Sequence, residues 1–128
     1  NKRVKFREEF RPFAPAVLDK FQKKYFSLGQ ESLHMLIACK VIKEFKKFIP
    51  AVVHVDNTCR VQTVKKKNNL KFYKLINEFY KITNIPVILN TSFNVKGQPI
   101  VNTPEDAIRT FLSTNIDVLA IGDYISVK

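Results

Sequence analysis

Glycine, cysteine, tryptophan and long apolar runs are scarce or absent in this 128-residue sequence. No stretch approaches the ~18 apolar residues that a membrane-spanning helix needs. No segment combines a charged start, an apolar centre and a small-residue cleavage site, as a secretory signal does. There is also no Gly-rich phosphate loop of the P-loop kind. These absences argue against a helical membrane protein and against P-loop nucleotide binding.

The chain has only two cysteines, Cys39 and Cys59, and their separation does not match a paired metal-ligand spacing. A reduced state in the cytoplasm is favoured over a structural disulfide. No nucleophile stands beside a base, and no carboxylates are paired for acid–base work. The first residue is Asn1 rather than Met, so we expect the chain to be cut from a longer protein.

Positive charge is abundant, with 22 basic and 11 acidic residues and a net charge of +11. Such a balance predicts a positive field and an anionic partner, either a nucleic acid or a smaller ligand such as a nucleotide or an acyl phosphate. Apolar residues make up 45% of the chain and include 11 Phe and 4 Tyr, which is enough for a core. Length and composition predict one domain over residues 1–128.

The clearest periodic segments predict a mixed α/β fold. Residues 70–82 place apolar side chains on one broad helical face. Thr103-Pro104-Glu105-Asp106 has the cap, the proline and the acids of a helix start, and that helix should end near Asn115. Gly122-Asp123 between two apolar runs predicts a hairpin. The remaining predicted elements are a helix over 14–25, strands over 2–7, 33–38, 51–55, 60–64 and 86–89, and an ambiguous segment over 41–48.

Lys5 and Arg7 stand two apart, so on a strand they would share a face and could clamp a phosphate, with Phe6 turned to the core. The alternative is a solvated strand edge. Arg11 lies among Phe10, Pro12 and Phe13, so we expect its stem to be partly covered and its charge to need an anion. That anion is either a ligand or one of the neighbouring acids, Glu8 and Glu9.

Arg60 begins a predicted strand after a turn, a favoured place for ligands in open α/β sheets. His54 and Asp56 are weak metal ligands, because no third ligand is near, and a structural hydrogen bond is the better interpretation of His54. Residues 90–94 follow a predicted buried strand. Their hydroxyls and amides, above all those of Ser92 and Asn94, can face an oxyanion. The alternative interpretation of this segment is an ordinary polar loop.

Three runs closely resemble the C-terminal domain of the NodU/CmcH carbamoyltransferases, which make O-carbamoylated antibiotics and nodulation factors. They are VKFREEFRPFAPAVL, IPAVVHVDNTCRVQTV and PVILNTSFNVKGQPIVNTPEDAI. The resemblance covers nearly the whole chain, and three long motifs in the right order are highly specific. It implies a YrdC-like α/β domain with a twisted mixed sheet, flanking helices and a basic ligand cavity, here truncated at its N-terminus.

The resemblance also implies a reaction: the domain binds ATP and carbamoyl phosphate and forms carbamoyl adenylate. The family's Lys-x-Arg and Ser-x-Asn signatures correspond here to Lys5 with Arg7 and to Ser92 with Asn94. The arginines of the FRPFAP and RVQTV segments correspond to Arg11 and Arg60. Catalytic roles are implied for Lys5, Arg11, Arg60 and Ser92, and ligand-binding roles for Lys5, Arg7, Arg11, Arg60, Ser92 and Asn94.

The implied cofactor is Mg²⁺ carried with ATP, while iron or another metal belongs to an N-terminal transferase domain of the sugar-kinase/actin-like superfamily that this chain lacks. That domain is the implied partner, and a second copy of the chain could cover apolar surface left by the truncation. The fragment alone is not expected to complete the transfer. The main alternative is an RNA-binding YrdC-like module, and an interaction-only domain is a third; neither a membrane nor an intrinsic metal is expected.

Overall fold

The computed structural model describes residues 1–128. The chain folds into two compact units, although its composition shows no boundary at either junction. We call Pro12–Thr91 the sheet unit. Asn1–Arg11 and Ser92–Lys128 together form the other, which we call the hairpin unit. No helix is long and apolar enough to cross a membrane.

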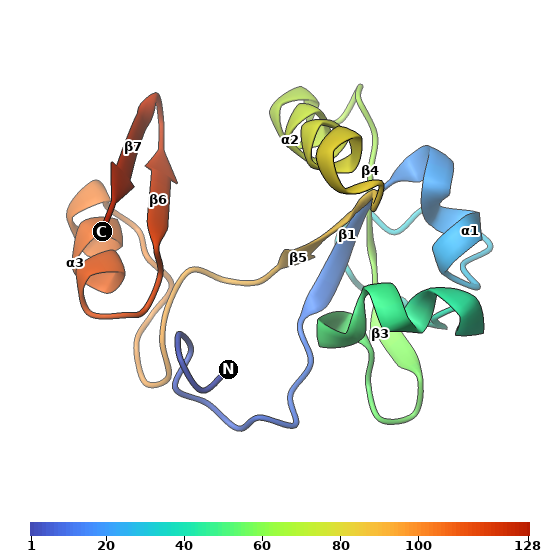
Figure 1. Ribbon diagram of the computed structural model, residues 1–128, viewed down its shortest axis with the longest axis horizontal. Helices are drawn as coiled ribbons and strands as arrows, with labels where there is room; N and C mark the ends of the chain where they lie inside the picture. Colours follow the sequence, from blue (N-terminus) through green and yellow to red (C-terminus); the bar gives the residue numbers. More distant parts are fainter. The chain divides into compact units, whose positions relative to one another are not determined.

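The sheet unit is built on a three-stranded sheet in the order β4-β1-β5 (Figure 1). Its central strand β1 (Ala14–Leu18) runs parallel to β4 (Gln62–Val64) and antiparallel to β5 (Val87–Asn90). Helix α2 (Leu70–Thr83) connects β4 to β5. The predicted mixed α/β class is therefore confirmed. The helix predicted over residues 70–82 and the strand predicted over 86–89 are confirmed as α2 and β5.

The predicted helix over residues 14–25 is wrong. Its first half is strand β1, and only the 3₁₀ turn Asp19–Phe21 and the short helix α1 (Gln22–Tyr25) are helical. The spacing of Leu18, Phe21 and Tyr25 mimics a helical face, but residues 16–18 are buried with neighbouring strands on both sides. Burial between two strands outweighs local periodicity, because ladder hydrogen bonds and packing stabilise β1 together.

Alternation along β1 distributes its side chains between two cores. Ala16 and Leu18 pack with Ile76 of α2, whereas Val17 belongs to a second cluster that includes Phe26 and Val61. Helix α2 is capped by Asn69, whose side chain accepts a hydrogen bond from Phe72 N at 3.0 Å. Part of its apolar face, with Ile76, Phe72 and Tyr73, packs against one side of the sheet, whereas Leu75 and Phe79 are exposed.

The second core also holds a small antiparallel pair formed by β2 (Ala38–Lys40) and β3 (Thr58–Arg60). Cys39 and Cys59 lie opposite each other in it as free thiols, with their Sγ atoms 3.9 Å apart. The predicted strands over 33–38 and 51–55 are wrong apart from Ala38. Residues 33–37 are turn and coil, and the second segment begins with the 3₁₀ helix Pro50–Val52. The ambiguous segment forms the 3₁₀ helix Lys43–Phe48.

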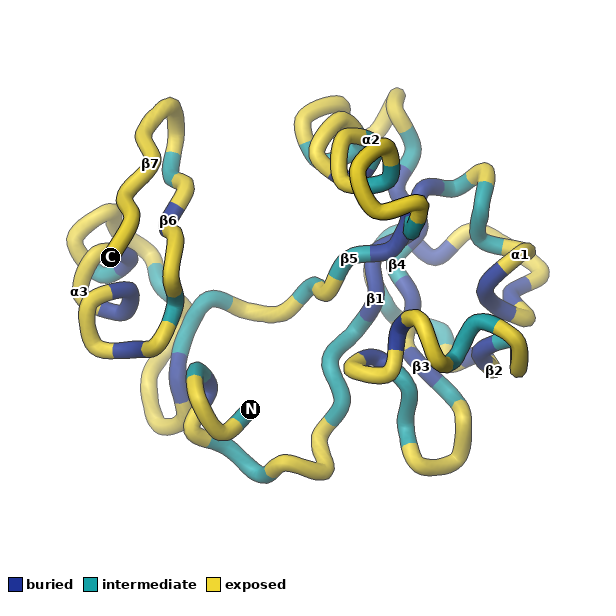
Figure 2. Tube along the Cα trace, in the orientation of Figure 1, coloured by how far each residue is buried: buried dark blue, intermediate teal, exposed yellow.

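The hairpin unit contains α3 (Pro104–Leu112) and the antiparallel strands β6 (Val118–Ile121) and β7 (Tyr124–Val127). Thr103 caps the helix and Gly122 takes a φ of 58°, so the predicted helix start and two-residue hairpin are confirmed. The helix ends at Leu112, before the predicted end. Ala107, Phe111 and Leu119 form the core of this unit, and β7 is exposed along its length (Figure 2).

Candidate functional site

The first basic motif lies in a turn instead of the predicted strand over 2–7. Lys5 N donates to Asn1 O at 3.1 Å, and Phe6 has a φ of 50°. The expectation that Phe6 faces the core is also wrong, since its side chain is exposed. Alternating sequence is not enough for a strand without a neighbouring strand to complete its hydrogen bonds. Lys5 and Arg7 therefore do not share a strand face.

Lys5 is nevertheless buried, with 6% of its surface exposed. Its Nζ donates to Ser92 O at 2.7 Å, to Ser92 Oγ at 3.3 Å and to Asn94 Oδ1 at 2.9 Å. An ammonium has three N–H groups, so all of them are engaged within the protein. Burial, together with the nearby Arg7 charge, lowers the pKa of Lys5. The two motifs that stand 87 residues apart in sequence are thus joined directly.

The Ser92–Asn94 segment is held in shape by its own side chains. Ser92 Oγ donates to Asn94 Oδ1 at 2.6 Å, and Asn94 Nδ2 donates to Gln98 O at 2.9 Å. Gly97 takes a φ of 81°, a conformation that a side chain would disfavour. A further hydrogen bond from Lys96 N to Lys5 O, 2.9 Å long, ties this loop to the N-terminal turn. The loop is therefore part of a fixed structure with the first motif.

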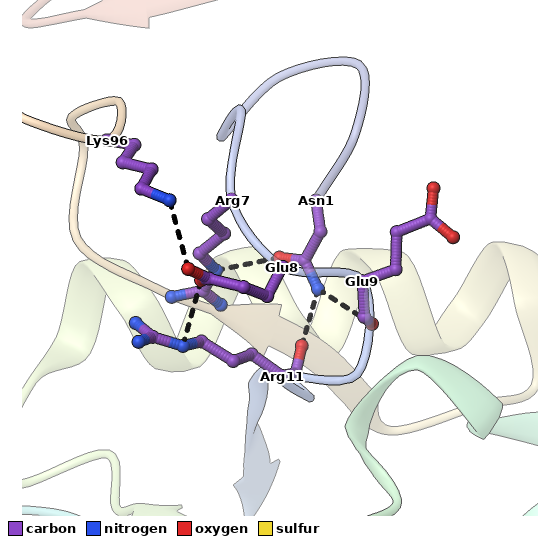
Figure 3. Close-up of polar contacts among 6 residues, drawn as sticks. All are labelled: Asn1, Arg7, Glu8, Glu9, Arg11 and Lys96. Atoms are coloured by element: carbon purple, nitrogen blue, oxygen red, sulfur yellow. Dashed lines mark hydrogen bonds and ion pairs between the residues drawn. The ribbon is translucent and has the colours of Figure 1, made fainter.

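A second set of charges surrounds Glu8 (Figure 3). Glu8 Oε1 lies 3.0 Å from Lys96 Nζ, and Glu8 Oε2 lies 3.2 Å from Arg11 Nε. The second contact is an ion pair without hydrogen-bond alignment, because Oε2 is buried and makes no hydrogen bond. Backbone hydrogen bonding, Lys96 and Arg11 hold the pKa of the Glu8 carboxyl below its usual value. A ligand anion and a neighbouring acid were the two partners predicted for Arg11, and in the structure Arg11 pairs with the neighbouring acid Glu8.

Asn1 shapes this N-terminal turn. Its Oδ1 accepts a hydrogen bond from Arg7 Nε at 2.7 Å, and its Nδ2 donates to the backbone oxygens of Glu9 and Arg11 (Figure 3). The expected covering of the Arg11 stem is not found, since 56% of this side chain is exposed. Arg11 is therefore accessible at the surface, although its charge is already paired.

These residues line one pocket of about 250 Å³ in the hairpin unit. Cations outnumber acids in its wall, so the pocket favours an anion. Five of the six predicted site residues belong to this wall. Its full lining is Lys5, Arg7, Glu8, Arg11, Ser92, Asn94, Val95, Lys96, Gly97 and Gln98.

Sequence reasoning missed Lys96 as a pocket residue and treated Glu8 only as a structural partner for Arg11. Lys96 follows Asn94 by two positions, so its closeness to the Ser-x-Asn motif could have marked it as a candidate pocket residue. Spacing alone could not reveal its ion pair with Glu8, because 88 residues separate the two. Tertiary contact between the loop and the turn creates this pair.

Arg60, the sixth predicted residue, belongs to the sheet unit. It ends β3, lies opposite Ala38 and is exposed. The pocket is lined only by residues of the hairpin unit, so the pocket does not include Arg60, and its role stays a prediction.

The Asp56 side chain and the His54 backbone make hydrogen bonds in the turn before β3. Asp56 Oδ1 accepts hydrogen bonds from Thr58 N at 2.9 Å and from Thr58 Oγ1 at 2.7 Å. His54 N donates to Thr58 O at 2.8 Å. No group of three or more His, Cys, Asp or Glu residues is placed to hold a metal ion.

The family model for the carbamoyltransferase C-terminus matches residues 1–128. The chain is 42% identical to nodulation protein NolO of Bradyrhizobium diazoefficiens over 95% of its own length and 23% of that protein. It is 41% identical to nodulation protein U of Rhizobium tropici over 74% of its length and 16% of that protein.

An uncharacterised protein of Methanocaldococcus jannaschii is 44% identical over the whole chain and 25% of its own length. The chain thus spans about a quarter or less of these relatives. The match over the complete chain, together with the Lys-x-Arg and Ser-x-Asn motifs joined in one pocket, leads to one conclusion: the chain belongs to the carbamoyltransferase C-terminus family.

Proposed function

We propose that this chain forms the part of an O-carbamoyltransferase that binds ATP and carbamoyl phosphate and makes carbamoyl adenylate. The complete protein would then transfer the carbamoyl group to a hydroxyl acceptor. The observation that carries the proposal is the pocket of the hairpin unit, with four cations around about 250 Å³. Both ligands carry phosphate, and cations fixed in a partly enclosed site stabilise its charge.

The pocket residues divide the work by their chemistry. Arg7 and Arg11 have planar guanidinium groups that suit phosphate oxygens, and Lys96 adds a mobile positive charge. Lys5 contributes charge and holds the Ser92–Asn94 segment, because its own N–H groups are engaged there. Ser92 also lines the pocket, and its hydroxyl donates to Asn94 Oδ1. Arg60 is retained as a predicted contributor to adenylate formation.

Mg²⁺ is proposed to accompany ATP. The pocket wall has Glu8 as its acidic residue, which does not form a cage of carboxylates. Mg²⁺ commonly keeps several waters and binds through phosphate oxygens, so the residues present fit a metal brought by the nucleotide. Iron or another metal for the transfer step is assigned to a separate N-terminal transferase domain.

That N-terminal domain is also the proposed partner of this chain. The chain spans about a quarter or less of its relatives, which leaves ample length for a second domain. Self-association over exposed apolar side chains is a further proposal, with the exposed strand β7 as one available surface. The two free thiols fit a reducing compartment such as the cytoplasm.

Calorimetric titration with ATP and with carbamoyl phosphate tests the proposal. We expect both to bind and Arg11→Ala to weaken binding roughly tenfold, because a charged hydrogen-bond donor is lost. Lys66→Ala is the matched control, since it removes one positive charge from an exposed position of the sheet unit. Equal affinities in wild type and Arg11→Ala would show that the pocket is not the site.

RNA binding remains the second candidate because most of the basic residues lie in the sheet unit, outside the pocket. The same titration with a short RNA at two salt concentrations separates the candidates. RNA binding that falls steeply with salt, without nucleotide binding, would favour the alternative. Nucleotide binding weakened roughly tenfold in Arg11→Ala and unchanged in Lys66→Ala would favour the adenylate-forming domain.

A further inference from the structure

We infer that Glu8 is a built-in counter-ion of the pocket, which an anionic ligand must displace from Lys96 and Arg11 in order to bind there. This inference rests on the proposed function, since it assumes that the pocket takes a phosphate ligand. It concerns a residue for which the Lys-x-Arg and Ser-x-Asn signatures give no role. The carboxylate stands between two cations of the pocket, where a ligand anion would need to bind (Figure 3).

The first argument is the distribution of partners among the four cations. The three N–H groups of Lys5 are engaged by Ser92 and Asn94, and Arg7 Nε donates to Asn1 Oδ1 at 2.7 Å. Lys96 and Arg11 both contact Glu8, at 3.0 Å and 3.2 Å. A ligand that seeks Lys96 and Arg11 must therefore compete with a carboxylate already in place.

The second argument is that the carboxylate can be displaced. The side chains of Arg11 and Lys96 are 56% and 61% exposed, and partly exposed ion pairs are weak. Glu8 Oε2 makes no hydrogen bond, so displacement of the carboxylate gives up the hydrogen bond from Lys96 Nζ and a backbone hydrogen bond, both of which water or a ligand can replace at this partly exposed site. The Glu8 carboxylate therefore balances the charge of Arg11 and Lys96 in the free protein and can be displaced by a ligand anion.

The third argument concerns charge. An anion with one negative charge replaces the Glu8 carboxylate without adding net attraction. A polyphosphate brings several charges, so it can engage Lys96 and Arg11 and gain further from Arg7 and Lys5. Glu8 would in this way raise the threshold for every anion, and an anion with several charges overcomes it through its further contacts with Arg7 and Lys5.

The test compares inorganic phosphate with tripolyphosphate as probes, by calorimetric titration of the whole chain at pH 7 and constant salt. In wild type we expect tripolyphosphate to bind far more tightly. In Glu8→Gln the affinity for phosphate should rise roughly fivefold, the size expected when two partly exposed ion pairs no longer compete. The affinity for tripolyphosphate should rise at least as much, because removing the Glu8 carboxylate also removes its repulsion of a more highly charged ligand.

Glu9→Gln is the matched control. It makes the same change of charge and shape one residue away, at an exposed side chain whose ion pair with Lys2 is 3.9 Å long. Glu8→Asp keeps the charge on a shorter side chain and should fall between wild type and Glu8→Gln. Thermal unfolding of each variant establishes that it is folded, and Glu8→Asp still tests the inference if Glu8→Gln does not fold.

Tighter phosphate binding in Glu8→Gln alone supports the counter-ion, because damage to the fold would not tighten binding. Weaker binding of both probes would instead make Glu8 a brace for Arg11 and Lys96, and equal effects of Glu8→Gln and Glu9→Gln would indicate a general charge effect. Either result overturns the inference while the proposed function stands. If neither wild type nor Glu8→Gln binds any probe, ATP or carbamoyl phosphate, the proposed function falls together with it.

Discussion

Lys5 is a buried charge whose surroundings explain why it is tolerated. Three oxygen acceptors surround its ammonium, which compensates for the loss of water around a charged group. Two of these acceptors belong to Ser92 and the third to Asn94, so one residue connects the beginning of the chain to a loop late in it. Its first effect is structural, and the ligand chemistry of the pocket depends on that structure.

Lys5→Met should therefore destabilise the protein. Methionine fills similar space but donates no hydrogen bond, so Asn94 Oδ1 and Ser92 O lose this donor. We expect the free energy of unfolding to fall by about 2–3 kcal/mol, the size expected when hydrogen bonds to a charged group are lost. Urea unfolding gives the value. Lys2→Met, at an exposed residue of the same turn, should change stability by less than about 0.5 kcal/mol; equal effects of the two would contradict this account.

The turn before β3 depends on one carboxylate. Asp56 accepts from the side-chain hydroxyl and the backbone N–H of Thr58, and these bonds lower the pKa of Asp56 from its usual 3.8. Because the folded pKa is depressed, the stabilisation is present above the unfolded pKa. It is lost as the pH falls through the folded value.

Asp56→Asn should remove this acid-dependent contribution while keeping an acceptor oxygen. Wild type should be more stable than the variant at pH 6, and the difference should shrink steadily in acid below the unfolded pKa near 3.8. Urea unfolding from pH 6 to pH 3 measures it. Asn57→Asp places a carboxylate one residue further on as a control for charge. A stability difference that does not change with pH would show that the Asp56 charge contributes nothing.

Helix α3 begins at a cap that the sequence already indicates. Thr103 Oγ1 accepts from Asp106 N at 3.2 Å, so Thr103→Ala should lower the free energy of unfolding by about 1 kcal/mol. The neighbouring Asn102→Ala changes an exposed residue before the cap and should have little effect. Chemical unfolding followed by circular dichroism compares them. Equal losses in the two variants would mean that the cap is not the cause.

At the scale of the whole molecule, the chain has two units with separate cores. The sheet unit packs Ala16, Leu18, Val64 and Ile76 together, and the hairpin unit has its own cluster around Phe111. The positive charge and the pocket lie in different units. Most basic residues are in the sheet unit, whereas the pocket belongs to the hairpin unit. Net charge is therefore a poor guide to where the pocket lies.

Separate cores predict separate local unfolding. Ile76→Ala deletes a fully buried side chain and should destabilise the sheet unit by about 2–5 kcal/mol. Amide hydrogen exchange should then speed up in β1 and α2, while the amides of α3 exchange as in wild type. Leu75→Ala, at the exposed neighbouring position, is the control. Faster exchange throughout the chain would show that the two units unfold as one.

Predictions from local sequence were reliable where the residues that stabilise an element lie within that element. The helix α2, the cap of α3 and the Gly122-Asp123 turn each depend on residues within a short segment, and all three predictions are confirmed. Residues 14–18 were predicted as helix and form β1 because strands distant in sequence flank them. Their conformation depends on those neighbours more than on local periodicity.

The sequence by itself determined the family, the mixed α/β class, the excess of positive charge and five residues that line one pocket. Only the tertiary structure decided how those residues are used. The Lys5 ammonium donates hydrogen bonds to Ser92 and Asn94, and Glu8 pairs with Arg11 and Lys96. The physical reason is that hydrogen bonds and ion pairs form between groups close in space, and four of these five contacts join residues more than 80 positions apart in sequence.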